Sequence, residues 1–135
     1  MISTTRRTVA TSILTVMLVG SGTAAAHAGG DDDHERRVTA NCSAATDWTL
    51  KVKQDDRRLE VELEIDANRV GQRWQVSMSH DRQRFFSGTR ETRGRSGSFE
   101  IERQVANHRG ADRITAVAHN PRTGERCRAA LTYAG

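Results

Sequence analysis

The sequence predicts one all-β domain, a single seven-stranded antiparallel β-sandwich that spans residues 41–135. Apolar and polar residues alternate in short runs along most of the chain, and turn-forming residues separate these runs. No window shows helical spacing of apolar residues over three turns. About 107 residues follow the first segment, which is enough for one core and too few for two. A small closed β-barrel is the alternative, because both folds share the same list of strands.

The first segment, residues 1–28, has the features of a secretory signal peptide. Arg6 and Arg7 precede an apolar run from Val9 to Val19, and a small-x-small cleavage pattern ends at Ala28, with Ala26 as the alternative site. The run is too short for a permanent membrane helix. The residues after the arginine pair match twin-arginine export poorly, so general secretion is preferred. We expect a secreted, extracellular protein that is not inserted in a membrane once the signal is removed.

Residues 29–40 are predicted to form a disordered polar tail, because they begin GGDDDHERR and show no apolar periodicity. Its acidic residues and His34 would hold a metal only weakly. The whole chain has 21 basic and 17 acidic residues, a formal charge of +4. Loss of Arg6 and Arg7 lowers this charge to +2, which argues against a nucleic-acid partner.

The stretch 57–81 shows the clearest strand pattern. Leu59, Val61, Leu63 and Ile65 alternate with acidic residues, and Trp74, Val76 and Met78 alternate with Gln and Ser. We therefore expect two antiparallel half-buried strands joined by a loop, with Trp74 as the most buried anchor. The same alternation, bounded by turn residues such as Pro121 and Gly124, gives the seven expected strands: 47–53, 58–66, 72–80, 84–89, 98–105, 112–120 and 125–133.

Cys42 and Cys127 are the only two cysteines, and an exported domain would hold them in an oxidising compartment. No CxxC motif or Cys/His cluster points to a metal site. One structural disulfide is therefore predicted. It would close most of the domain into one loop and contribute roughly 4–5 kcal/mol in the chain-entropy model.

Seven strands in an exported domain of this size resemble immunoglobulin-like and fibronectin type III sandwiches. That resemblance implies that the first and last strands run side by side in parallel, each with its cysteine near its start. The chain departs from true immunoglobulin domains, because Trp74 lies far beyond Cys42. It also resembles small secreted actinobacterial proteins of unknown function, through the RWxVxxxHD, SGSFEIER and NPxTGExC stretches. The latter resemblance implies no activity.

Three groups of residues raise the question of catalysis or metal binding. Ser79, His80 and Asp81 are triad residue types, but neighbours on a strand point to opposite sides and no nucleophile elbow is present. His80 and His119, near strand ends, would bind a metal with Asp81 or Asp112, although histidines that lie on the surface or bond a backbone carbonyl are the preferred interpretation.

A row of acidic residues, Glu60, Glu62, Glu64 and Asp66, has the residue type of glycosidase carboxylates. It is better explained as a solvated strand face with an arginine partner such as Arg73. No catalytic residue, cofactor or metal ligand is therefore predicted.

The richest candidate for binding is the segment 82–95. Arginine forks beside aromatic rings suit anionic groups such as phosphate, uronate or sulfate. The candidate binding residues are Arg82, Arg84, Phe85, Phe86, Arg90, Arg93 and Arg95. We expect a non-enzymatic module whose partner is an anionic cell-envelope polymer or another protein. The alternatives are a secreted hydrolase or hydrolase inhibitor, and a structural envelope-associated domain.

Overall fold

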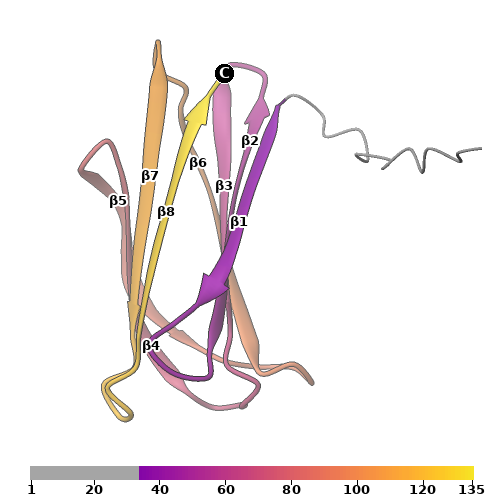
Figure 1. Cartoon of the computed structure of the whole chain (residues 1–135), viewed down its shortest axis with the longest axis vertical. Helices are drawn as coiled ribbons and strands as arrows, with labels where there is room; N and C mark the ends of the chain where they lie inside the picture. Colours follow the sequence, from indigo (N-terminus) through magenta and orange to yellow (C-terminus); the bar gives the residue numbers. More distant parts are fainter. Residues whose placement is uncertain (1–33) are drawn as a thin grey trace, which may run out of the picture.

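The computed structural model describes residues 34–135, which form eight β-strands in two antiparallel sheets and contain no helix (Figure 1). The first sheet has the order β1-β2-β3-β6, with β1 at Glu35–Asn41, β2 at Asp47–Asp55, β3 at Arg58–Asp66 and β6 at Ser98–Ala106. The second has the order β5-β4-β7-β8, with β5 at Gln83–Glu91, β4 at Arg73–His80, β7 at Ala111–His119 and β8 at Arg126–Ala134. None of these described residues forms a helix long and apolar enough to cross a membrane.

Period-two alternation places the core between the two sheets, in a sandwich-like arrangement. The apolar residues of β3 are buried and its acidic residues are half-buried on the outer face. Trp74 is 0% exposed and is the largest fully buried side chain, as the sequence predicts. β3 and β4 belong to different sheets, so the apolar residues of 57–81 meet across the core instead of lying side by side.

The prediction of seven strands is wrong, because β1 is an eighth strand. It occupies the second half of the segment predicted to be a disordered tail, 29–40, and pairs antiparallel with β2 from Glu35↔Lys53 to Asn41↔Asp47. β1 is an edge strand with mainly exposed side chains, held by its ladder to β2 and by a hydrogen bond of 2.9 Å between the Thr39 and Thr49 hydroxyls. It has no apolar alternation to detect. The predicted signal peptide, residues 1–28, and residues 29–33 lie outside the described residues.

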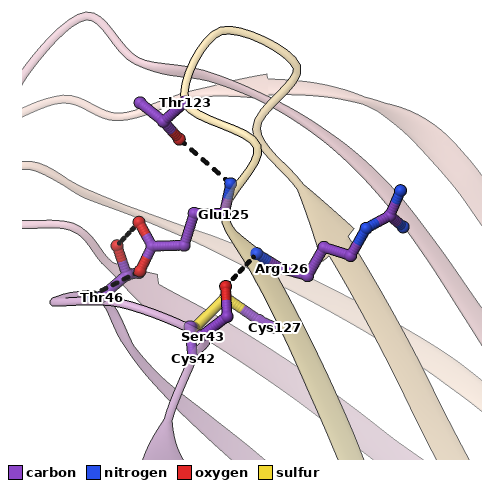
Figure 2. The surroundings of a disulfide bond; sticks show 7 residues. All are labelled: Cys42, Ser43, Thr46, Thr123, Glu125, Arg126 and Cys127. Atoms are coloured by element: carbon purple, nitrogen blue, oxygen red, sulfur yellow. Dashed lines mark hydrogen bonds between the residues drawn. A yellow bond between two sulfur atoms is a disulfide. The ribbon is translucent and has the colours of Figure 1, made fainter.

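The predicted disulfide between Cys42 and Cys127 is confirmed. It joins the β1–β2 loop to the start of β8 and so links the two sheets. Figure 2 shows the contacts that reinforce this link: the Arg126 N–H donates to the Ser43 hydroxyl at 2.9 Å. The Ser43 N–H also donates to the Arg126 carbonyl, at 2.8 Å.

The parallel pairing of first and last strands that the immunoglobulin resemblance implies is not present. β2, which corresponds to the first predicted strand, lies in the first sheet and β8 lies in the second. β1 runs toward the disulfide and β8 runs away from it, so these two strands are antiparallel (Figure 1). β2 and β8 both run away from the disulfide, as expected, but they do not pair because they belong to different sheets.

Successive strands alternate in direction, which gives the sandwich two distinct ends (Figure 1). The disulfide end carries the β1–β2, β3–β4, β5–β6 and β7–β8 loops. The terminal end carries His34, the β2–β3 and β4–β5 turns, the β6–β7 loop and the C-terminus. There the Gln54 N–H donates to the His34 carbonyl at 2.8 Å, and the Tyr133 hydroxyl lies 3.4 Å from the same oxygen.

Candidate functional site

The predicted arginine-rich segment does not form one surface. Arg82 and Arg84 lie at the β4–β5 turn, at the terminal end, whereas Arg93 and Arg95 lie in the β5–β6 loop, at the disulfide end. Strand β5, nine residues long, separates the two pairs. At a rise of about 3.3 Å per residue, that separation is about 30 Å. A single ligand group cannot contact both pairs.

The two phenylalanines of this segment are not exposed platforms for stacking. Phe86 is buried, and the guanidinium groups of Arg90 and Arg103 each lie 4.9 Å from its ring centroid. Phe85 is partly buried against the core, where the pairing of β4 with β5 shifts by one residue, from Met78↔Phe86 to Ser79↔Arg84. This bulge removes Phe85 from the alternation. The aromatic part of the predicted site is therefore used in packing.

Arginines from several segments instead converge at the disulfide end. Arg69, Arg73 and Arg122 line a recess of about 540 Å³ between the β3–β4 and β7–β8 loops. Arg73, Arg90 and Arg93 line an adjoining groove of about 730 Å³. Arg73 borders both hollows, and we therefore treat the two together as one basic region. We call it the arginine recess, defined by Arg69, Arg73, Arg90, Arg93 and Arg122.

Few acidic groups offset these arginines. Glu125 is the only acidic residue in the four loops at the disulfide end, and its carboxylate accepts hydrogen bonds from the Thr46 N–H and hydroxyl, both at 2.9 Å (Figure 2). Glu91, on β5, lies 3.7 Å from Arg73 in the groove. The Arg73 side chain is 78% exposed, so water screens this pair. The Arg73 guanidinium group therefore remains accessible to an anion, whereas that of Arg90 lies against the Phe86 ring and donates to the Thr89 carbonyl at 2.9 Å.

The backbone beneath the recess is fixed by contacts between the β3–β4 and β5–β6 loops. Thr92 is fully buried, its hydroxyl donates to the Arg69 carbonyl, and the Gln72 N–H donates to that hydroxyl at 3.0 Å. The Gly71 N–H donates to the Thr92 carbonyl at 2.8 Å. Gly97 packs against the backbone of Arg69. These contacts fix the backbone of the two loops that carry Arg69 and Arg93.

Of the residues of the recess, sequence reasoning identified Arg90 and Arg93 and missed Arg69, Arg73 and Arg122, whereas the predicted Arg95 does not line either hollow. A signal for the missed residues was present. In an antiparallel sandwich whose successive strands alternate in direction, every second loop lies at the same end. The predicted strand list therefore already placed the arginines of alternate loops together.

The residues considered for catalysis or metal binding are only partly brought together. His80 points into the core and Ser79 is on the outer face of β4, as expected of strand neighbours. The same expectation is wrong for His80 and Asp81, because Asp81 lies in the β4–β5 turn and its carboxylate comes within 3.3 Å of His80. His119 lies at the far end of β7 from Asp112, so it does not meet His80. The neighbours of His80 are the carboxylates of Asp112 and Asp81, at 2.5 and 3.3 Å. The pKa of Asp81 is lowered, mainly because its carboxylate accepts a hydrogen bond from the backbone N–H of Arg113.

The acidic row on β3 is part of the outer face of the first sheet. Its partner is Lys51 on β2, which pairs with Glu62, and not Arg73 as suggested from the sequence. The hydrogen bond to Glu62 raises the pKa of Lys51. Burial, followed by repulsion from Glu62 and Glu64, raises the pKa of Glu100 on β6. These groups form a charged strand face without an enclosing cleft among the described residues.

Comparison with known proteins returned no matching protein-family model and no matching curated protein.

Proposed function

We propose that this protein is a secreted, non-enzymatic β-sandwich that binds an anionic ligand at the disulfide end. The observation that carries this proposal is the arginine recess, in which Arg73 borders two hollows that collect arginines from three further segments. Guanidinium forks bind carboxylate, phosphate and sulfate groups through paired hydrogen bonds. The disulfide also suits an oxidising, extracellular compartment.

An anionic polymer is the ligand class that fits the recess best. A single anion would occupy one hollow, whereas a chain with repeated negative groups would contact both at once, on either side of Arg73. Cell-envelope polymers that carry phosphate or uronate groups have this character. The neighbours of His80 are carboxylates and not a nucleophile, which supports a binding role over hydrolysis.

The strand order supports an immunoglobulin-like type of sandwich. Without β1, the sheets are β2-β3-β6 and β5-β4-β7-β8. This arrangement matches an immunoglobulin-like order in which the fourth strand has joined the second sheet. Trp74 lies on the third of these seven strands, where immunoglobulin domains carry their buried tryptophan. Loops at one end of such sandwiches commonly form the ligand site, which agrees with the position of the recess.

The proposal is tested by retention on immobilised polygalacturonate and polyphosphate. We expect the triple variant Arg69→Ala/Arg73→Ala/Arg122→Ala to elute at a clearly lower salt concentration than the unmodified protein. The reason is that the variant lacks three guanidinium groups that bind phosphate or carboxylate. The matched control is Arg57→Ala/Arg82→Ala/Arg84→Ala, which removes equal charge at the terminal end. Equal losses in the two variants would show that only net charge matters, and would refute a binding site at the recess.

A further inference from the structure

At the terminal end, polar residues occupy two inward-facing positions of the core. Along β4, Trp74, Val76 and Met78 point inward, and the next inward position is His80. Along β7, the inward position before Ile114 is Asp112, which is 0% exposed. A buried carboxylate is costly unless a positive partner or a metal ion compensates its charge. These two positions therefore require an explanation beyond packing.

Two further side chains complete a cluster around this pair. Asp81, in the β4–β5 turn, and His108, in the β6–β7 loop, approach from the solvent side. One ligand atom from each of the four residues lies within 4.8 Å of the other three. His80 Nε2 lies 2.5 Å from Asp112 Oδ1 and 3.3 Å from Asp81 Oδ2. His108 Nδ1 lies 2.8 Å from Asp81 Oδ2 and 3.6 Å from Asp112 Oδ1.

Backbone N–H groups hold both carboxylates, that of Asp81 through the oxygen that does not face the histidines and that of Asp112 through the oxygen that does. The Arg113 N–H donates to Asp81 Oδ1 at 2.9 Å, which leaves Asp81 Oδ2 for the cluster. The His108 N–H donates to Asp112 Oδ1 at 3.2 Å. The other oxygen of this carboxylate, Asp112 Oδ2, is buried and has no hydrogen-bond partner. Asp112 is thus a fully buried carboxylate that faces two histidines through one oxygen and has no hydrogen-bond partner for the other, and such an unsatisfied group points to a ligand such as an ion.

We propose that His80, Asp81, His108 and Asp112 bind a Zn²⁺ ion. Two imidazole nitrogens and two carboxylate oxygens are a ligand set that zinc accepts in tetrahedral geometry. Ligand bonds of about 2.1 Å place tetrahedral ligand atoms about 3.4 Å apart. Two of the four neighbouring separations, 3.3 and 3.6 Å, are near this value. The other two, 2.8 Å between His108 and Asp81 and 2.5 Å between His80 and Asp112, are hydrogen-bond distances that open when the metal takes the place of the hydrogen.

One adjustment accompanies binding. The rings of His80 and His108 are stacked, with centroids 4.3 Å apart and planes 16° apart. Nitrogen lone pairs lie in the ring plane, so two parallel rings cannot both aim at one ion. The His108 side chain is 50% exposed, on a loop, and is free to turn, whereas His80 is fixed in the core.

The site is structural in character. Four protein ligands leave no open position for water or substrate. Two carboxylates with two neutral imidazoles carry a charge of −2, which one divalent ion neutralises. The ion would connect β4 and its turn to the β6–β7 loop and the start of β7. The inference is independent of the proposed anion binding, since the cluster and the arginine recess lie at opposite ends.

The test is titration of untagged, chelator-treated protein with ZnCl₂, followed by calorimetry. We expect one equivalent to bind and the unfolding temperature to rise. His108→Ala should weaken binding at least ~10-fold, because even loss of a residue that only supports a zinc ligand costs about 10–100-fold. Because the His108 ring is half exposed, we expect the His108→Ala variant to fold, and far-UV circular dichroism checks its secondary structure. Asp81→Asn, which keeps the turn residue polar, should also weaken binding.

Two histidine variants control for zinc bound elsewhere. His119→Ala, at the far end of β7, should bind zinc as the unmodified protein does, and so should His34→Ala. Cobalt(II) should give the visible absorption of a tetrahedral site in the unmodified protein and in both controls, and not in His108→Ala. The proposal is overturned if no stoichiometric zinc binds, or if His108→Ala and Asp81→Asn bind unchanged. It is equally overturned if only His34→Ala loses binding.

Discussion

Gly97 is the residue whose size matters most directly to the arginine recess. It has a φ of +65°, and a Cβ atom there would lie 2.3 Å from the Arg69 nitrogen. We predict that Gly97→Ala lowers the free energy of unfolding by more than about 2 kcal/mol, because backbone strain adds to overpacking. Urea denaturation measures this loss.

Gly94 supplies the matched control in the same loop. Its φ is +70°, but a Cβ atom there would meet nothing within 4 Å. Gly94→Ala should therefore cost only the strain of the left-handed conformation, about 1 kcal/mol. Equal losses for the two variants would mean that the contact between Gly97 and Arg69 has no energetic importance.

The β4–β5 turn contains a residue poorly suited to its conformation. Asp81 and Arg82 both have positive φ, 48° and 71°, as in the two-residue hairpin turn that favours Asp-Gly. Arg82→Gly should stabilise the protein by about 0.5–1 kcal/mol, because relief of strain exceeds the added flexibility of the unfolded chain. A rise in the calorimetric unfolding temperature would confirm this, and a fall would show that the Arg82 side chain stabilises the turn.

At the scale of elements, like charges face each other across β3 and β6. Glu100 is opposite Glu64, and its pKa is raised above the ordinary 4.5, first by burial and then by Glu62 and Glu64. A raised pKa means that folding favours the protonated carboxyl. This contribution to stability is present below the ordinary pKa and is lost as pH rises through the higher folded value.

The Glu100→Gln variant tests this reasoning. It should unfold at a higher temperature than the unmodified protein at pH 7, where Glu100 is ionised. The difference should shrink as pH falls below 4.5, since the carboxyl is then protonated in both states. Unfolding temperatures of both proteins between pH 3 and 7 provide the measurement. A difference that does not depend on pH would exclude charge as the cause.

Strands with a buried face were predictable from the sequence, and the edge strand was not. Alternation in β3 and β4 reports burial on one face, which is why Leu59 and Trp74 were placed correctly. Strand β1 buries little and is held by backbone hydrogen bonds to β2, which leave no pattern in its side chains. The assignment of β3 and β4 to different sheets depends on contacts distant in sequence, which alternation does not report.

For the whole molecule, the disulfide is the main covalent constraint. It links residues 85 positions apart and joins the two sheets at one end. Replacing both cysteines, by Cys42→Ala/Cys127→Ala, should lower the free energy of unfolding by roughly 4–5 kcal/mol, because the unfolded chain gains freedom. Guanidinium denaturation tests this, with the reduced unmodified protein as control. A loss under 1 kcal/mol would show that the folded contacts alone hold the two sheets together.

The candidate sites required the whole fold, because each one joins residues distant in the sequence. The pairing of His80 with Asp112 follows from the register of β4 with β7, which places His80 opposite Ile114. Both residues continue the alternation of inward-facing positions in the sequence. His80 comes two residues after Met78 on β4, and Asp112 comes two residues before Ile114 on β7. The sequence did not indicate His108, which lies in a loop and belongs to no alternating run.

The position of the C-terminus has a practical consequence. His34 and the C-terminus lie together at the terminal end, away from the arginine recess (Figure 1). A protein coupled to a sensor surface through Gly135 would therefore present its basic loops outward, toward the solution. Biosensor measurements on such an oriented layer should give full ligand capacity, whereas random coupling would block part of it.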